Sequence, residues 1–307
     1  MKTVLGIDVG GTKISYCIVN EEGKVISEIF KTKTPKTTTE IIETFKTIIS
    51  EFEQKVDAIA FATAGAINLT NTKVESSTPN LPEGYNKIDF STLSSKPVYV
   101  ENDANAAAFA EYKIGAAKGH LNTITVTLGT GIGGGIIING KMLRGKSGRG
   151  GEVGSIKLFP DKRRKCTCNN YDCWESYASG TGLKTTAQEL AINDISFKTS
   201  IFKDKKPSEV TTHDIVKGLK ENDKYSKKVF DLWQSHLVSG LISLTNIFDP
   251  ESIIISGGMG EFIEIEKLEK EINNTIVVSP IKLLLAKMKN DAGMVGAALL
   301  ALEPYNK

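Results

Sequence analysis

The sequence has little of what marks secreted, membrane-spanning or nucleic-acid-binding proteins. Its 38 Lys and Arg residues nearly balance 36 Asp and Glu, and a net charge of +2 gives no reason to propose binding to nucleic acid or to an anionic membrane. Asp8 interrupts the first apolar run too early for a signal peptide. The apolar stretches 253–256 and 283–286 have the length of core segments, not of membrane spans. We therefore expect a cytoplasmic protein that binds neither nucleic acid nor membrane.

Cysteine and histidine are also scarce, with four and three residues among 307. Cys166, Cys168 and Cys173 nevertheless lie within eight positions, and only Cys17 lies elsewhere. This crowding suits a metal site or a structured loop better than a disulfide framework.

The length suggests two domains, and a composition with 40% hydrophobic and 24% charged residues is that of a globular protein. A strand, a glycine turn and a second strand occur near residue 8 and again near residue 129, which is a weak internal duplication. The lysine-rich segment 198–228 is expected to form solvated helices and loops. The patterns predict strands at 3–9, 14–19, 25–29, 58–62, 98–100, 123–128, 136–138 and 252–255, and helices at 38–52, 102–114, 235–248 and 293–302.

The turn Asp8-Val-Gly10-Gly11-Thr12-Lys13 joins two of these strands. Paired glycines let a backbone rich in N–H groups approach an anion closely. The carboxylate of Asp8 would repel a phosphate, but it can hold Mg²⁺ or the waters around it. By itself this hexapeptide is also compatible with an ordinary hairpin turn.

The second glycine turn, residues 127–135, contains a formal G-x-G-x-x-G pattern. A dinucleotide fold requires a helix after this pattern, whereas the β-branched run 136–138 predicts a strand. Phosphate binding by the N–H groups around Thr130 and Gly131 remains the better interpretation.

Two further glycine segments have competing interpretations. Residues 140–147 match the P-loop pattern, but they begin at the Asn139-Gly140 turn and continue into Gly148-Arg-Gly150-Gly151, which is a poor helix start. The pair Gly257-Gly258 follows a buried strand and could admit a base or a ribose, or could simply connect that strand to a helix.

Carboxylates supply the candidate chemistry. Asp103 is expected in the first turn of an alanine-rich helix, where it could accept a proton from a substrate hydroxyl or merely cap the helix. Asn102 offers a donor and an acceptor to a sugar hydroxyl. Glu152 and Glu175 could each bind two adjacent sugar hydroxyls, or could be solvated surface residues.

Taken together, these motifs resemble the ROK family of sugar kinases and repressors over essentially the full chain. The matches, in family order, are Asp8–Lys13, Glu101–Asn105, 127–135, Gly151–Gly154, Cys166–Cys168 with Cys173–Glu175, Ser179–Gly180 and Asp291–Gly293. The resemblance implies an α/β fold with two ribonuclease H-like domains of the actin/hexokinase-like ATPase type around a cleft. We expect a small domain from residues 1–115 with the C-terminal helix 291–307, and a large domain from 116–290 with a cysteine loop at 155–175.

The resemblance also implies residue roles. Asp103 would be the general base. Sugar contacts would come from Asn80, Asn102, Asp103, Glu152, Ser155 and Glu175. ATP contacts would come from Asp8, Gly10, Gly11, Thr12, Lys13, Thr130, Gly131, Gly257 and Gly258. The implied cofactors are ATP and Mg²⁺, and the implied assembly is a homodimer.

The sequence departs from the family where zinc would bind. The family pattern E-x-G-H, C-x-C-G-x-x-G-C-x-E supplies one His and three Cys, but the His position here is Ser155 and the loop glycines are Asn169 and Asp172. Serine is a poor zinc ligand, so a structural zinc is doubtful. Cys166, Cys168 and Cys173 could keep zinc with water or Asp172 as the fourth ligand; otherwise packing around Tyr171 and Trp174 would hold the loop.

We therefore expect an ATP-dependent kinase for the 6-hydroxyl of a sugar. The divergent cysteine loop and Asn80–Tyr85 look more like N-acetylmannosamine kinases, with glucose as the main alternative substrate. A sugar-responsive repressor is disfavoured, because the strand at 3–9 leaves no preceding DNA-binding domain and the net charge is nearly neutral.

Overall fold

The computed structural model describes residues 1–78 and 80–303. They form two compact units, described separately below. Unit 1 contains the described residues of 1–125, 135–151 and 286–307, and unit 2 contains 126–134 and 152–285. Both are mixed α/β structures, which confirms the predicted fold class.

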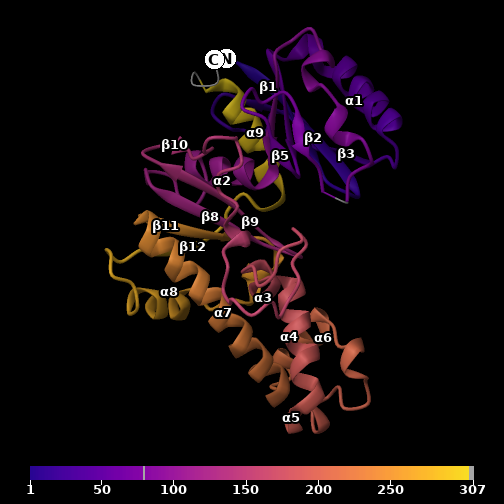
Figure 1. Ribbon diagram of the computed structural model, residues 1–307. Helices are drawn as coiled ribbons and strands as arrows, with labels where there is room; N and C mark the ends of the chain where they lie inside the picture. Colours follow the sequence, from indigo (N-terminus) through magenta and orange to yellow (C-terminus); the bar gives the residue numbers. More distant parts are fainter. Residues whose placement is uncertain (79, 304–307) are drawn as a thin grey trace. The chain divides into compact units, whose positions relative to one another are not determined.

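Two five-stranded sheets form the framework (Figure 1). The first has the order β3-β2-β1-β4-β7, and the second has the order β10-β9-β8-β11-β12. In the first, β1 pairs antiparallel with β2 and parallel with β4, which pairs parallel with β7. An antiparallel meander continued by parallel strands is the ribonuclease H-like order that the family resemblance implies. The strands are β1 (Thr3–Val9), β2 (Lys13–Asn20), β3 (Phe30–Lys33), β4 (Ala58–Thr63), β7 (Val98–Asn102), β8 (Thr123–Leu128), β9 (Ile132–Ile138), β10 (Lys141–Met142), β11 (Ser252–Ser256) and β12 (Lys282–Leu285), with β5 (Ala66–Ile67) and β6 (Val74–Ser76) as a small separate pair.

Helices with one buried face cover these sheets. In α1, the residues Ile41, Phe45, Ile48 and Ile49 recur at helical spacing and are buried. The α-helices are α1 (Thr38–Phe52), α2 (Asp103–Lys113), α3 (Glu175–Ala178), α4 (Gly180–Asn193), α5 (Ile195–Lys198), α6 (Thr212–Lys220), α7 (Lys224–Phe248), α8 (Ile265–Asn273) and α9 (Ala292–Leu302). Short 3₁₀ turns lie at 53–55, 85–87, 90–92, 153–155, 207–209, 258–262 and 289–291.

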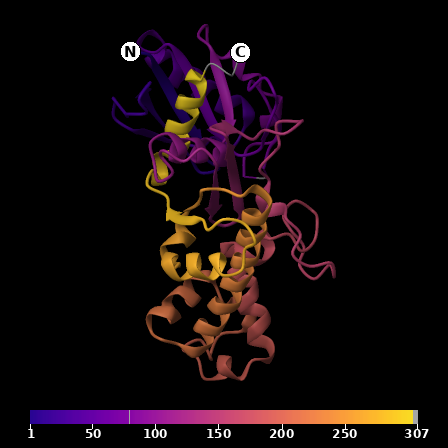
Figure 2. The same cartoon turned by 90° about the vertical axis from the view of Figure 1, so that its left-hand side faces the viewer.

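The C-terminal helix α9 packs on the N-terminal sheet and on α2 within unit 1, and Figures 1 and 2 both show it beside the N-terminal strands. Its contact with α2 is very close, because a β-carbon at Gly296 would lie 1.7 Å from the carbonyl oxygen of Ala106. A glycine is therefore required at position 296. Because α9 also packs on the N-terminal sheet, residues near the two ends of the chain share one core.

Several predicted elements are shifted. The strand expected at 25–29 is wrong: the third strand is Phe30–Lys33, while Val25 forms only an isolated bridge with Val19. The Ser27 hydroxyl takes the N–H of Ile18, so a side chain replaces ladder pairing there. The strand expected at 136–138 begins at Ile132, which shortens the glycine turn.

Residues 135–151 pack with unit 1, whereas we expected them in the large domain. Gly135 fits against α2, since a β-carbon there would lie 2.4 Å from that of Ala108. Arg144 in the same segment pairs with Glu101 of β7. These long-range contacts explain why a linear boundary at residue 115 differs from the observed units.

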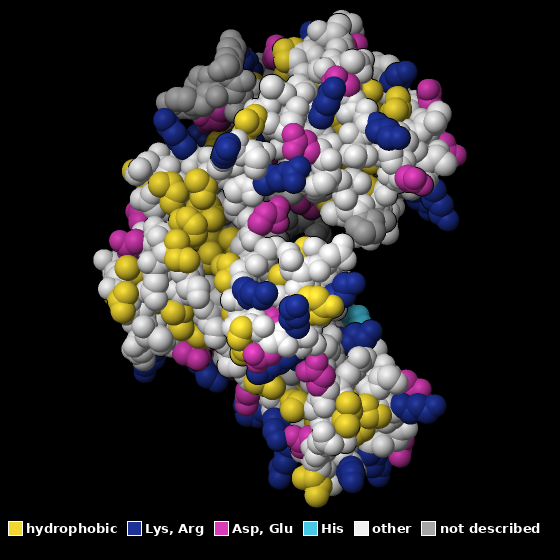
Figure 3. Space-filling view, viewed as in Figure 1, with side chains coloured by type: hydrophobic (Ala, Val, Ile, Leu, Met, Phe, Trp, Pro, Cys, Tyr) yellow, Lys and Arg dark blue, Asp and Glu magenta, His cyan; other side chains and the backbone are white. Residues whose placement is uncertain are grey.

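The surface drawn in Figure 3 carries Lys and Arg side chains interspersed with Asp and Glu. The lysine-rich segment 198–228 contains α6 and the start of α7, and several of its lysines pair with acids, such as Lys205 with Asp214 at 2.7 Å. Among the described residues, no helix is both long and apolar enough to cross a membrane.

Candidate active site

Two carboxylates lie at the carboxyl ends of parallel strands in unit 1, on either side of β4. Asp8 of β1 is in register with Ala62 of β4, and Ala62 is in register with Glu101 of β7. Asp103 follows β7 directly and begins α2. Because β1, β4 and β7 are parallel, their carboxyl ends meet at one edge of the sheet, where ligands of such sheets bind.

The protein environment disfavours the charged form of both acids. Burial raises the pKa of the Asp8 carboxyl to about 7, with repulsion from Asp103 adding to the rise and Lys13 opposing it. The Asp103 side chain keeps an exposed surface, yet desolvation by the surrounding protein raises its pKa as well. On the other side of Asp8, a β-carbon at Gly293 would lie 3.1 Å from the carboxyl carbon. Two acids with raised pKa values at a strand edge are typical of a functional site.

The turn after β1 is compact and leaves its tip exposed. The N–H of Gly10 donates to the carbonyl of Lys13 at 3.0 Å, and the hydroxyl of Thr34 donates to the carbonyl of Gly10 at 2.6 Å. Gly11 meets Asn80, since a β-carbon there would lie 2.9 Å from both the β-carbon and the carbonyl oxygen of Asn80. The structure thus brings a predicted sugar residue against the predicted phosphate turn, and Thr12 is exposed.

Asn102, rather than Asp103, caps α2. Its Oδ1 accepts from the N–H groups of Ala104 at 3.0 Å and Asn105 at 3.1 Å, and its Nδ2 donates to the carbonyl of Gly65 at 3.0 Å. Asp103 therefore lies in the first helical turn, where the helix dipole favours its ionised form. Asn102 supplies the cap, and Asp103 Oδ1 also accepts from the N–H of Ala104 at 2.9 Å.

In unit 2, the glycine turn after β8 lies against Glu175. The N–H of Ile132 donates to Glu175 Oε2 at 2.9 Å, and a β-carbon at Gly131 would lie 2.4 Å from that oxygen. The other carboxylate oxygen accepts from the Thr167 hydroxyl at 2.6 Å. In this structure the predicted sugar ligand Glu175 thus contacts the turn that carries Thr130, whose carbonyl accepts from Thr181.

The turn with Glu152 and Ser155 packs on Ile132, at the start of β9. A β-carbon at Gly154 would lie 2.3 Å from the carbonyl oxygen of Ile132, and the N–H of Ser155 donates to the carbonyl of Glu152 at 3.1 Å. Both side chains are exposed. Unit 2 therefore gathers Glu152, Ser155 and Glu175 around the start of β9.

The predicted nucleoside turn, Gly257-Gly258, contacts the end of β8. Gly257 has φ +89° and lies over the end of β8, because a β-carbon there would lie 2.3 Å from the carbonyl oxygen of Leu128. A β-carbon at Gly258 would meet nothing within 4 Å, so this side of the turn is open. Turns after β8 and β11 thus lie together within unit 2.

Two alternative nucleotide motifs lack the helix that they require. The strand β9 begins within the G-x-G-x-x-G pattern, and the P-loop-like segment 140–147 contains the short strand β10 and an irregular loop. Asn139 and Gly140 both have positive φ values, as the predicted tight hairpin turn requires. Both rejections are therefore confirmed.

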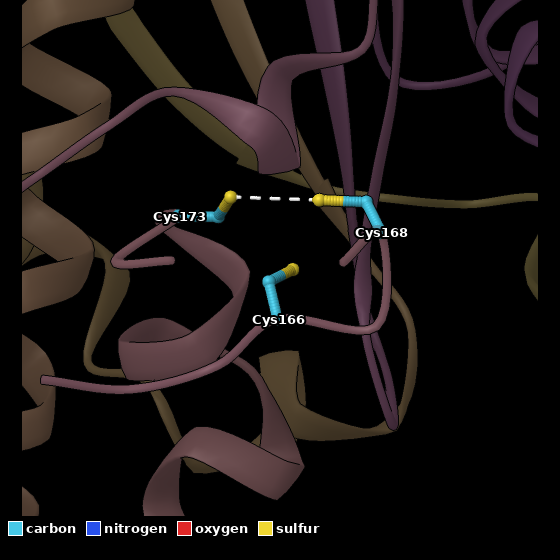
Figure 4. Close-up of side chains that lie close together, drawn as sticks. All are labelled: Cys166, Cys168 and Cys173. Atoms are coloured by element: carbon cyan, nitrogen blue, oxygen red, sulfur yellow. Dashed lines mark hydrogen bonds between the residues drawn. The ribbon is translucent and has the colours of Figure 1, made fainter. Parts of the chain in front are cut away.

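The three clustered thiols fit three corners of a zinc site. Their sulfur atoms lie within 4.8 Å of one another, and Cys168 Sγ is 3.7 Å from Cys173 Sγ (Figure 4). Zn–S bonds of about 2.3 Å place two ligands of a tetrahedron about 3.8 Å apart. Within the described residues, no carboxylate or His lies within 4.8 Å of all three thiols, although Glu175 Oε1 lies 3.6 Å from Cys166 Sγ.

Asp172 is turned to other partners. Its carboxylate accepts from the N–H groups of Arg163 and Arg164 and from the Tyr177 hydroxyl at 2.6 Å. It and Asn169, which replace the family's loop glycines, have φ values of +56° and +65°. Asp172 thus shapes the loop and does not complete a zinc site. Trp174 is fully buried as expected, whereas Tyr171 is exposed and does not anchor the loop.

Comparison with known proteins identifies the family. The sequence model of the ROK family matches residues 4–304, and the chain belongs to this family. A glucokinase from Streptomyces coelicolor is 33% identical over 99% of both chains. A Bacillus subtilis xylose repressor is 28% identical over 98% of this chain and 77% of its own length.

Solved structures agree with this placement. A ROK family glucokinase from Streptomyces griseus, in complex with glucose and AMPPNP, is 32% identical with a TM-score of 0.77 over 97% of this chain and 98% of that one. A ROK hexokinase from Thermus thermophilus is 27% identical with a TM-score of 0.81 over 97% of both chains.

Proposed function

We propose that the protein is an ATP-dependent sugar kinase that transfers the γ-phosphoryl group to the 6-hydroxyl of a hexose. The observation that carries this proposal is the pair of carboxylates, Asp8 and Asp103, at the carboxyl ends of parallel strands in a ROK chain. The similarity to glucokinases supports the reaction class.

Asp103 would act as the general base. Its raised pKa makes it a better proton acceptor than an ordinary Asp, and its place at the start of α2 keeps an ionised form available. As O6 attacks the γ-phosphorus, the O6 proton would pass to Asp103 and the leaving group would be ADP. The glycine turns at Gly10–Thr12 and at Thr130–Gly131 would bind phosphate oxygens through backbone N–H groups.

Asp8 fits the role of a Mg²⁺ ligand, direct or through water. Its carboxylate is raised in pKa by burial and by the charge of Asp103, and a nearby divalent cation would relieve both effects. Mg²⁺, when bound with ATP, would offset the negative charge of the phosphates. Lys13, which lowers the pKa of Asp8, lies beside the same turn.

For the substrate, we propose glucose first, because two glucokinases at 32–33% identity align along nearly the whole chain. The family resemblance favoured N-acetylmannosamine, and Ser155 in place of the family His is the observation that keeps this sugar as the second candidate. We propose a homodimer, as expected from the family.

A coupled ADP-release assay with glucose, N-acetylmannosamine, N-acetylglucosamine, fructose and allose tests the proposal. We expect one sugar to exceed the others in kcat/KM by at least about tenfold, since one extra group in a pocket is worth that much. The Asp103→Asn variant serves as the blank. Absence of ADP release with every sugar would contradict the proposed reaction.

A further inference from the structure

Glu101 is a buried carboxylate directly before the two proposed site residues Asn102 and Asp103. Its side chain is 1% exposed. An ionised carboxylate is stable in such a place only when charged and hydrogen-bonding partners replace its water. The partners of Glu101 come from separate parts of unit 1.

The two carboxylate oxygens have different partners. Oε2 pairs with the Arg144 guanidinium at 2.5 Å and accepts from the Tyr99 hydroxyl at 3.2 Å, and the Asn71 amide lies 3.5 Å from it. Oε1 accepts from the backbone N–H of Asn102 at 2.9 Å and from the side-chain amide of Asn105 at 3.0 Å. Oε1 thus holds residues on both sides of Asp103.

Arg144 belongs to the P-loop-like segment 140–147, which has no part in the proposed phosphate binding. Its loop is closed by the N–H of Gly150, which donates to the carbonyl of Arg144 at 2.9 Å, and a β-carbon at Gly150 would lie 2.9 Å from the Arg144 carbonyl carbon. Gly145 has φ +65°. The guanidinium, 20% exposed, also donates to the Tyr99 hydroxyl. The loop therefore presents one cation to a fully buried acid.

We propose that Arg144 and Glu101 form a positioning pair for Asp103 and Asn102. Arg144 fixes the Glu101 carboxylate by pairing with it, and Glu101 fixes the end of β7 and the first turn of α2, from which Asp103 projects. This inference rests on the proposed role of Asp103 as the base, and neither Arg144 nor Glu101 is required to touch the substrate.

Steady-state kinetics of Arg144→Met, Arg144→Lys, Glu101→Gln and the double variant Glu101→Gln/Arg144→Met test the proposal, at a temperature where each variant is folded by circular dichroism. We expect Arg144→Met to lower kcat on the order of 10²-fold, because a misplaced catalytic group costs about that much. The KM for MgATP should stay within about twofold, since the bonds of the pair run to Tyr99, Asn102 and Asn105, which are not proposed ATP ligands. Lysine should restore part of the kcat loss. The double variant should lose no more than its worse single variant, as expected of one interacting pair.

Arg149→Met is the matched control. It removes an arginine from the same loop, but its partner Glu75 and its own side chain are both exposed. Unchanged kinetics are expected there.

A folded Arg144→Met with kcat within threefold of the wild type would overturn the proposal, as would additive losses in the double variant. If Arg144→Met does not fold, wild-type kcat in both Arg144→Lys and Glu101→Gln would overturn it. A wild-type protein that phosphorylates no sugar would instead overturn the proposed function, and the positioning role with it.

Discussion

Asp103 is the residue at which reactivity and stability oppose each other. Desolvation raises its pKa, which makes it a better base but means that the folded protein holds an ionised carboxylate at a disadvantage. The same property therefore predicts a kinetic effect and a stability effect of opposite sign.

Replacing Asp103 by Asn should lower kcat at least about 10²-fold, because a positioned base is lost while the shape is kept. In the wild-type enzyme, the acidic limb of kcat/KM should lie above pH 3.8, since protonation of the base stops the reaction and its pKa is raised from that value. Steady-state assays from pH 4.5 to 9 measure both. Near-normal turnover in the folded variant would refute the assignment.

The same variant should be more stable than the wild type at neutral pH. A raised folded-state pKa stabilises the fold fully below the unfolded value of 3.8 and loses that contribution as the pH rises through the folded value. Asn avoids this loss. Thermal melts should therefore show a higher Tm for Asp103→Asn at pH 8 and no difference near pH 3.5. A lower Tm at pH 8 would contradict the pKa shift.

Ser155 predicts weak zinc retention. Three thiols fit zinc, and the fourth position lacks a protein ligand among the described residues. Ile156 and Lys157, next to Ser155, pair with Trp174 and Cys173, so a His at position 155 would start beside the cluster. We expect dialysis against a chelator to strip the wild type and to leave about one zinc per chain in Ser155→His. Cys168→Ser is the control without zinc. Equal retention by wild type and Ser155→His would argue against the open position.

At the scale of elements, the start of α2 joins helix stability to the site. Asn102→Ala removes a cap that accepts two N–H groups, and we expect a loss of about 1 kcal/mol in the free energy of unfolding. It should also raise the KM for the sugar, if Asn102 contacts it as proposed.

Thr211→Ala provides the comparison. Thr211 caps α6 by accepting the N–H of Asp214 at 3.2 Å, far along the chain from the carboxylates. A similar loss of stability with unchanged kinetics is expected there. Urea denaturation and steady-state kinetics of Asn102→Ala and Thr211→Ala test this difference. Equal changes in the KM for the sugar would show that the change comes from general instability and not from loss of a sugar contact.

Elements with strong local signals were predicted well. The strands Thr3–Val9 and Thr123–Leu128 and the helix Thr38–Phe52 have the expected bounds, because short β-branched apolar runs and helical spacing of apolar residues accompany burial. The prediction of a strand at 25–29 failed because backbone pairing with β2 is limited to a bridge at Val25, and the Ser27 hydroxyl accepts the N–H of Ile18 instead. Arg144 could not be found, because nothing local in its sequence indicates a partner on β7.

At the scale of the molecule, α9 brings the end of the described chain back to unit 1. Gly296→Ala should destabilise the protein by about 1–3 kcal/mol, because the new methyl group overlaps the Ala106 carbonyl oxygen and overpacking has that cost. Urea denaturation measures the change. The stability control is Gly258→Ala, whose methyl group would meet no atom within 4 Å. An equal effect of both variants would assign the loss to glycine replacement in general.

The sequence by itself determined the order of most elements, the α/β class and the glycine turns, because these depend on the spacing of apolar residues and on conformations that glycine and asparagine adopt locally. Its ordered motifs carried the family resemblance. Only the tertiary structure decided which side chains meet: Glu101 with Arg144, Glu175 with the Gly131 turn, and Asp172 with Tyr177 and not with the thiols. These pairings join residues that are distant in sequence or whose side chains are oriented by a loop. The interactions stabilise the protein only after folding has removed the side chains from water.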